Sequence, residues 1–84
     1  MAQQNHFSIT ITRVESILFQ GDILSVTLPG SEGQLTVLAH HEPLIALLKT
    51  GLVEIVHTDG TTRNTYEIEK GILEVSNNQV TILV

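Results

Sequence analysis

Three adjacent side chains of metal-ligand type, His40, His41 and Glu42, are the residues whose chemistry could most readily define a site. A metal site needs side chains that converge on one point, and the ligands usually come from more than one segment. In an extended chain, successive side chains point to opposite faces, so His40 and His41 do not easily share a metal. The pattern favours a structural or interface role and predicts no metal site. A site for a small ligand or a metal built on these three residues remains the alternative hypothesis.

A second polar segment, Gly30-Ser31-Glu32-Gly33, has glycines spaced as in a loop that could cradle a phosphate. It lacks the Gly-Lys-Ser/Thr sequence of a P-loop, and no helix is predicted behind it. Pro29 and Gly30 favour a chain reversal, because proline removes a ladder donor and glycine permits positive φ. We therefore interpret this segment as a tight turn. No serine lies in a G-x-S-x-G elbow, so the sequence predicts no catalytic residue and no cofactor.

The composition is that of one small domain, residues 1–84, in which 42% of the residues are hydrophobic but only 4% are aromatic. Ile, Leu and Val must build the core, and these residues favour β-structure. The net charge is −5 and there is no basic stripe, which argues against nucleic-acid binding. No apolar run reaches the roughly 18 residues of a membrane span. Residues 1–6 lack the layout of a signal peptide. We expect a soluble intracellular protein that does not insert into a membrane.

Alternation of apolar and polar residues, interrupted by turn signals, predicts a series of short strands around the two polar segments. Gly21-Asp22 is expected to be a turn or bulge, Asp59-Gly60 a tight hairpin turn with positive φ at both residues, and Asn77-Asn78 another hairpin turn. Residues 44–49 fit either a short strand or a single helical turn. The other expected strands are 7–12, 13–20, 23–28, 35–39, 52–58, 61–69, 72–76 and 79–84. This spacing indicates an all-β sandwich or small barrel.

Sequence segments spread along nearly the whole chain carry a resemblance to a known family. They are FQG at 19–21, VTLPGSEGQL at 26–35, HEPL at 41–44, LKTG at 48–51 and GILEV at 71–75. In this order and spacing they resemble the N-terminal domain of the epsilon subunit of F-type ATP synthases. The resemblance implies a flattened β-sandwich of about ten short strands in two sheets.

By this resemblance, the chain is a non-catalytic subunit of the central stalk, the rotor that couples ion translocation to ATP synthesis. The implied partners are the gamma subunit and the c-ring, with no nucleic acid and no small-molecule substrate. The implied gamma contact also includes an apolar sheet face. The residues implied to face the c-ring are Gly30, Ser31, Glu32, Gly33 and Gln34, and those implied to face gamma are His41, Glu42, Pro43 and Leu44.

The chain departs from the family pattern inside both implied interfaces. An acid usual at the position of Gln34 is an amide here, which weakens an ionic contact with arginines of the c-ring loops and leaves Glu32 to compensate. Ala39-His40 replaces the usual Pro-Gly before His41. This replacement loosens the corner and adds a polar side chain.

Family members continue beyond this domain into a helical hairpin that inhibits ATP hydrolysis. Because the sequence stops at Val84, we expect hairpin-mediated inhibition to be absent. The resemblance implies a peripheral position on the cytoplasmic side of the bacterial inner membrane, or alternatively on the stromal side of the plastid thylakoid membrane. The competing hypothesis is a free-standing β-sandwich that binds a ligand or metal through His40, His41 and Glu42.

Overall fold

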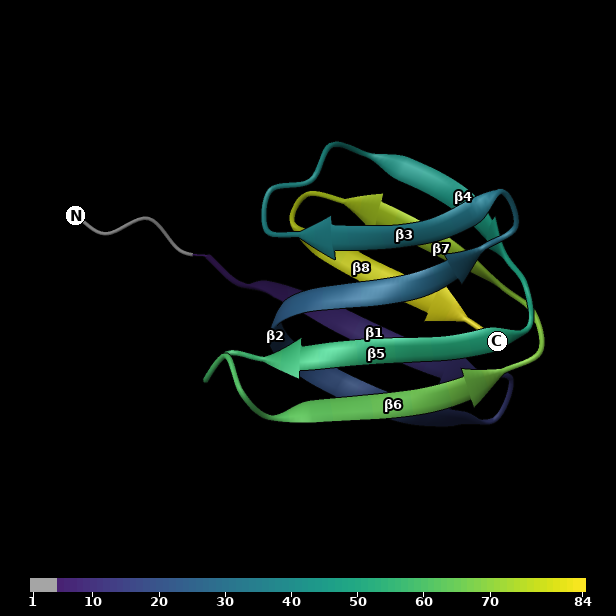
Figure 1. Ribbon diagram of the computed structural model, residues 1–84, viewed down its shortest axis with the longest axis horizontal. Coiled ribbons are helices and arrows are strands. Elements are labelled where there is room, and N and C mark those ends of the chain that lie inside the picture. Colours follow the sequence, from purple (N-terminus) through teal and green to yellow (C-terminus); the bar gives the residue numbers. More distant parts are fainter. Residues whose placement is uncertain (1–4) are drawn as a thin grey trace.

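The computed structural model describes residues 5–84, which form eight β-strands (Figure 1). Residues 1–4, which belong to the segment considered for a signal peptide, lie outside the described part. No helix in residues 5–84 is long and apolar enough to cross a membrane. In chain order the strands are β1 (Phe7–Arg13), β2 (Ser16–Gly30), β3 (Gly33–Leu38), β4 (Leu44–Leu48), β5 (Gly51–His57), β6 (Arg63–Ile68), β7 (Gly71–Ser76) and β8 (Gln79–Leu83).

The strands pair into a single sheet that folds into two layers. Its order is β1-β8-β7-β4-β2-β5-β6, with β3 paired to β2. The first half of β2 pairs with β1, whereas its second half pairs with β3 and β5, so one strand serves both layers. In Figure 1 the layer of β3, β5, β6 and the second half of β2 lies in front of β1, β7 and β8. The result is the predicted flattened β-sandwich.

The strand count is eight, so the prediction of about ten strands was wrong. The number ten came from the family resemblance. Of the strands expected from the sequence pattern, 13–20 and 23–28 merge into one, because β2 continues through the Gly21-Asp22 dipeptide that was expected to interrupt it. Gly21 pairs with Ile9 and Asp22 with Ser8, so β1 supplies backbone partners at the point where local signals suggest a break. The pairing of β2 is irregular on either side of this dipeptide: opposite Ile11 and Thr12 in the pairing with β1, and between Ile23 and Ser25 in the pairing with β5.

The other turns follow the sequence signals with one exception. Asn77 and Asn78 have φ values of 52° and 59°, which confirms the β7–β8 hairpin turn. Residues 44–48 form a strand rather than a helical turn. The tight turn predicted at Asp59-Gly60 was wrong, because Gly60 alone of the two has positive φ, at 78°. Residues 58–62 instead form a longer loop between β5 and β6.

The core is built almost entirely from Ile, Leu and Val, as the composition predicts. Alternation along β1 buries Phe7, Ile9 and Ile11 and leaves the residues between them partly exposed. No polar side chain is buried within residues 5–84. The buried side chains are Phe7, Ile9, Ile11, Ile23, Val26, Leu28, Val37, Leu48, Val53, Ile55, Ile68, Leu73, Val75, Val80 and Ile82.

Candidate docking surfaces

The first candidate surface is the tip of the β2–β3 hairpin, residues 30–34. Gly30 pairs with Gly33 and Pro29 with Gln34, so the turn itself contains only Ser31 and Glu32. All residues of the tip except Gly30 are exposed. Glu32 is therefore the exposed charged residue of the tip. The turn that was predicted from the glycine spacing is confirmed.

Strand β4 ties this tip to the other layer of the sandwich. The backbone N–H of Ser31 donates to the carbonyl of Leu47 at 2.9 Å, and the N–H of Lys49 donates to the carbonyl of Pro29 at 2.8 Å. Between these two bonds, Gly30 pairs with Leu48. The base of the tip is thus hydrogen-bonded to β4 as well as to β3.

A groove of about 460 Å³ lies between the tip and β4. Its walls are residues 30–35 on one side and residues 44–47 on the other. The fold therefore brings Leu44, from the second predicted interface, beside the five residues of the first. His41, Glu42 and Pro43 do not line this groove.

The second candidate surface is the corner between β3 and β4, residues 41–44. It follows a β-turn in which the N–H of His41 donates to the carbonyl of Leu38 at 3.3 Å. His40, the third residue of this turn, has a φ of 64°, a backbone region that residues other than Gly adopt uncommonly, with Asn, Asp and His enriched among those that do. Ala39-His40 stands where Pro-Gly is usual, so His40 occupies the turn position for which glycine is best suited.

The side chains at this corner do not gather around a common point. Nδ1 of His41 lies 2.7 Å from the backbone carbonyl oxygen of Glu42. The backbone N–H of His40 donates to Oδ1 of Asn78 at 2.7 Å. No set of three His, Asp or Glu side chains in residues 5–84 is placed to hold a metal ion. Nothing in this geometry favours the alternative hypothesis of a metal or ligand site.

An apolar face accompanies the corner, on the outer surface of β4, β7 and β8. Ile45 and Leu47 are 72% and 62% exposed, because the outward positions of β4 carry large apolar side chains. Leu47 pairs with Ile72 of β7, and Ile72 pairs with Leu83 of β8, so the three side chains form one row across three strands. We call Ile45, Leu47, Ile72 and Leu83 the β4 face. The sequence implied an apolar sheet face but not its residues; the signal was apolar residues at consecutive positions of LIALL.

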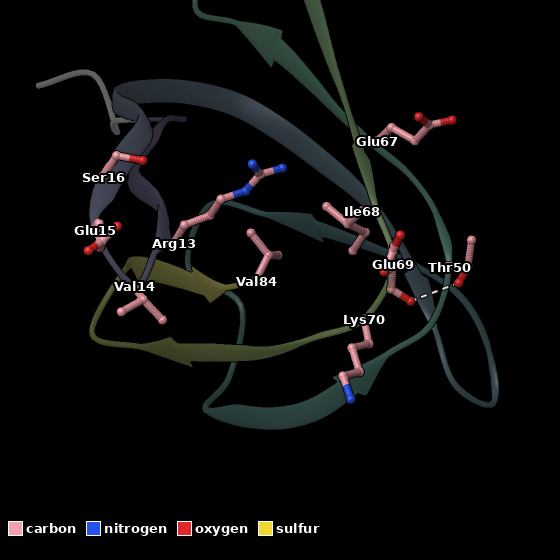
Figure 2. A pocket seen from close by; sticks show the side chains of 10 residues that line it. All are labelled: Arg13, Val14, Glu15, Ser16, Thr50, Glu67, Ile68, Glu69, Lys70 and Val84. Atoms are coloured by element: carbon pink, nitrogen blue, oxygen red, sulfur yellow. Dashed lines mark hydrogen bonds between the residues drawn. The ribbon is translucent and has the colours of Figure 1, made fainter.

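A second hollow, away from the tip and the corner, has a different character. It has a volume of about 1050 Å³ and is bordered by the β1–β2 turn, the β6–β7 turn and Val84. Figure 2 shows Glu15, Glu67 and Lys70 spread around its rim rather than converging. Its one drawn hydrogen bond runs from the hydroxyl of Thr50 to the backbone carbonyl of Glu69, at 2.8 Å (Figure 2). This bond connects two loops, and the arrangement suggests no catalytic group.

A single carboxyl group among the described residues has a pKa clearly shifted from its ordinary value. The hydroxyl and backbone N–H of Thr62, and then the N–H of Thr61, donate to Asp59 and hold the pKa of its carboxyl far below its usual range. Asp59 is exposed in the β5–β6 loop. These bonds stabilise the loop, so the shift does not indicate acid–base catalysis.

Relatives of known family match nearly the whole chain. The ATP synthase epsilon chain of a Nitratiruptor species is 45% identical over 76 residues, which cover 90% of this chain and 58% of that relative. The epsilon chain of Campylobacter fetus subsp. fetus is 39% identical over 80 residues, covering 95% of this chain and 61% of the relative. The chain thus spans about three fifths of the length of these curated relatives.

Solved structures match the fold. A chain in the cryo-EM structure of the Euglena gracilis mitochondrial ATP synthase (OSCP, F1 and c-ring) superposes with a TM-score of 0.84 at 28% identity, covering 90% of this chain and 48% of that one. A chain in the central stalk and c-ring of the Tetrahymena thermophila mitochondrial ATP synthase superposes with a TM-score of 0.78 at 16% identity, covering 92% and 61% of the two chains, which supports the fold alone. The family model of the β-sandwich domain of the ATP synthase delta/epsilon chain matches residues 6–84. This chain therefore belongs to the family of ATP synthase delta/epsilon chain β-sandwich domains.

Proposed function

We propose that the chain is a non-catalytic central-stalk subunit of an F-type ATP synthase, which docks on gamma and the c-ring and couples ion translocation to ATP synthesis. The observation that carries this proposal is the 45% identity to an ATP synthase epsilon chain over 90% of the chain. The similarity to a chain in a solved ATP synthase that includes F1 and the c-ring supports it. A stalk subunit needs interfaces rather than a reaction centre, and the tip, the corner and the β4 face are the surfaces that we propose for this role.

The tip, residues 30–34, is the proposed contact with the c-ring. Glu32 carries its negative charge and faces solvent, so it can meet a basic loop of the partner. Hydrogen bonds to both β3 and β4 hold the base of the tip. A tip anchored in this way transmits force into the sandwich without bending at its base.

The corner, residues 41–44, and the β4 face together form the proposed contact with gamma. Ile45 and Leu47 extend the apolar surface directly from the end of the corner. Burying a large aliphatic side chain fully is worth about 1.5–3 kcal/mol, so these two residues can supply much of the affinity for an apolar partner surface. The shared groove beside Leu44 makes the two proposed interfaces adjacent.

Docking on the c-ring implies a peripheral location. We propose the cytoplasmic side of the bacterial inner membrane, in keeping with the bacterial sources of the two relatives named above. The stromal side of a plastid thylakoid membrane is the alternative. Fractionation of the source cells, with detection of the chain in washed membranes before and after extraction of the F1 sector, distinguishes a peripheral from a free location.

Reconstitution tests the proposed function. The purified chain is added to a bacterial ATP synthase depleted of its epsilon subunit, and ATP-driven proton pumping is measured in vesicles. We expect the chain to bind the depleted complex at micromolar concentration and to restore coupled pumping. A chain that is folded but neither binds nor restores pumping would contradict the proposal.

A pair of substitutions tests the proposed gamma surface. Leu47→Glu places a charge on the β4 face, whereas Leu52→Glu places the same charge on β5 in the other layer, where Leu52 is 58% exposed. We expect Leu47→Glu to weaken binding to the depleted complex at least tenfold, because a carboxylate would have to be buried against an apolar surface. Leu52→Glu should bind like the unmodified chain. Equal losses in the two variants would exclude a docking surface specific to the β4 face.

A further inference from the structure

The side chain of Asn78 joins three segments that are far apart in the sequence. Its Oδ1 accepts the backbone N–H of His40 at 2.7 Å, and its Nδ2 donates to the backbone carbonyl of His6 at 3.1 Å. Its own backbone carbonyl accepts the N–H of Ser8 at 3.4 Å. One residue of the β7–β8 hairpin thus connects the start of β1 with the turn before the corner.

The turn that Asn78 contacts is poorly determined by its own residues. Positive φ at the third residue of a β-turn, as in a type II turn, favours Gly or Asn at that position, and Pro is common at the second position of such turns. Ala39 and His40 occupy these positions, and His40 has a φ of 64°. A backbone conformation that local preferences disfavour persists when surrounding contacts hold it in place. The hydrogen bond from His40 to Asn78 is such a contact, from a residue 38 positions away.

We propose that Asn78 is a positioning residue for the gamma-facing corner: its carboxamide clamps the turn of residues 38–41 to the start of β1. The identity of the partner in this inference rests on the proposed function. The clamp itself rests on the hydrogen bonds of Asn78. The clamp sets the direction in which residues 41–44 leave the turn. A Pro-Gly pair would make the turn rigid through its own backbone preferences. The clamp instead makes the turn rigid through hydrogen bonds from another segment.

Asparagine is well suited to this position. Its φ of 59° lies in the left-handed region, which Asn tolerates better than most residues. The carboxamide has an acceptor at one end and a donor at the other, so it can bind an N–H and a carbonyl at the same time. Glycine would keep the turn and lose both bonds, whereas aspartate at neutral pH could not donate to the carbonyl of His6.

Amide hydrogen exchange tests the clamp without any partner. In the Asn78→Gly variant, NMR should show that the His40 amide exchanges about fivefold faster. An acceleration of this size is expected when one hydrogen bond is lost. Asn77→Gly is the matched control, because Asn77 precedes Asn78 in the same turn and has a similar φ of 52°. The control should leave exchange at His40 unchanged. An unchanged His40 amide in Asn78→Gly, or an equal acceleration in the control, would overturn the proposal.

Affinity for the depleted ATP synthase tests the positioning role. Asn78→Gly should weaken binding about fivefold in the unmodified background. In a background carrying Ala39→Pro and His40→Gly, where the turn is determined locally, the same change should weaken binding less than about twofold. Equal weakening in both backgrounds, in variants that remain folded, would refute a positioning role. Failure of the unmodified chain to bind would contradict the proposed function, and hydrogen exchange would still decide the clamp.

Discussion

Replacing Gly30 by alanine should destabilise the domain through a steric clash at the base of the tip. An added Cβ would lie 2.5 Å from the backbone oxygen of Gly33 and 3.1 Å from Cγ of Leu35. The oxygen must move by about 1 Å to restore an ordinary contact of about 3.5 Å. It belongs to the paired backbone of β3, so the shift disturbs the ladder rather than a flexible side chain.

The size of this effect follows from two opposing terms. Overpacking a closely packed site costs about 1–3 kcal/mol. Replacing Gly by Ala also reduces the entropy of the unfolded chain, which stabilises the folded state by about 0.4–1 kcal/mol. With each term at the middle of its range, the free energy of unfolding should fall by about 1–2 kcal/mol. With an m-value of about 1 kcal/mol/M for a domain of this size, the urea midpoint should fall by about 1–2 M.

Gly21→Ala is the matched control within the same strand. Its added Cβ would approach the ring of Phe19 no closer than 3.5 Å, an ordinary contact. Urea unfolding followed by circular dichroism should show this variant to be at least as stable as the unmodified chain. The steric reasoning is refuted if Gly30→Ala unfolds at the unmodified midpoint, or if both variants lose the same stability.

Three further predictions follow from the core and from exposed polar contacts. Leu73→Ala, at a fully buried position, should cost about 3 kcal/mol in urea unfolding, whereas Leu83→Ala at a half-exposed position should cost much less. Asp59→Asn should lower the unfolding midpoint at pH 7; because the folded pKa is depressed, the difference should shrink as the pH falls below the ordinary carboxyl value of 3.8. A difference that stays constant down to about pH 2 would contradict the assigned pKa shift. Arg63→Ala removes an exposed ion pair with Glu54 (3.4 Å) and should change the free energy of unfolding by less than about 1 kcal/mol.

The sequence pattern was sufficient to predict most of the local structure. Alternation along β1 identified its buried side chains, because a strand with one covered face must place apolar residues at every second position. Asn77-Asn78 predicted a hairpin, because asparagine tolerates the left-handed backbone that such a turn requires. The motif order identified the family that the family model then matched over residues 6–84.

Long-range pairing settled the features for which local signals were insufficient or misleading. Gly21 favours a break by its own preferences, yet it continues β2 because β1 offers hydrogen-bond partners from a separate strand. Leu47, Ile72 and Leu83 of the β4 face form a row only when β4, β7 and β8 are aligned.

The two polar segments, residues 30–33 and 40–42, show the same difference between what local sequence and what long-range packing determine. Their residue types favoured a tight turn over a phosphate loop and disfavoured a metal site, because those functions need motifs or convergent side chains that the sequence does not display. Their spatial relation required the fold: the pairing of Gly30 with Leu48 brings the tip beside β4, and Asn78 holds the turn at His40. Local sequence specifies turns and alternation, whereas the partners of a strand or a side chain are specified only when distant segments pack together.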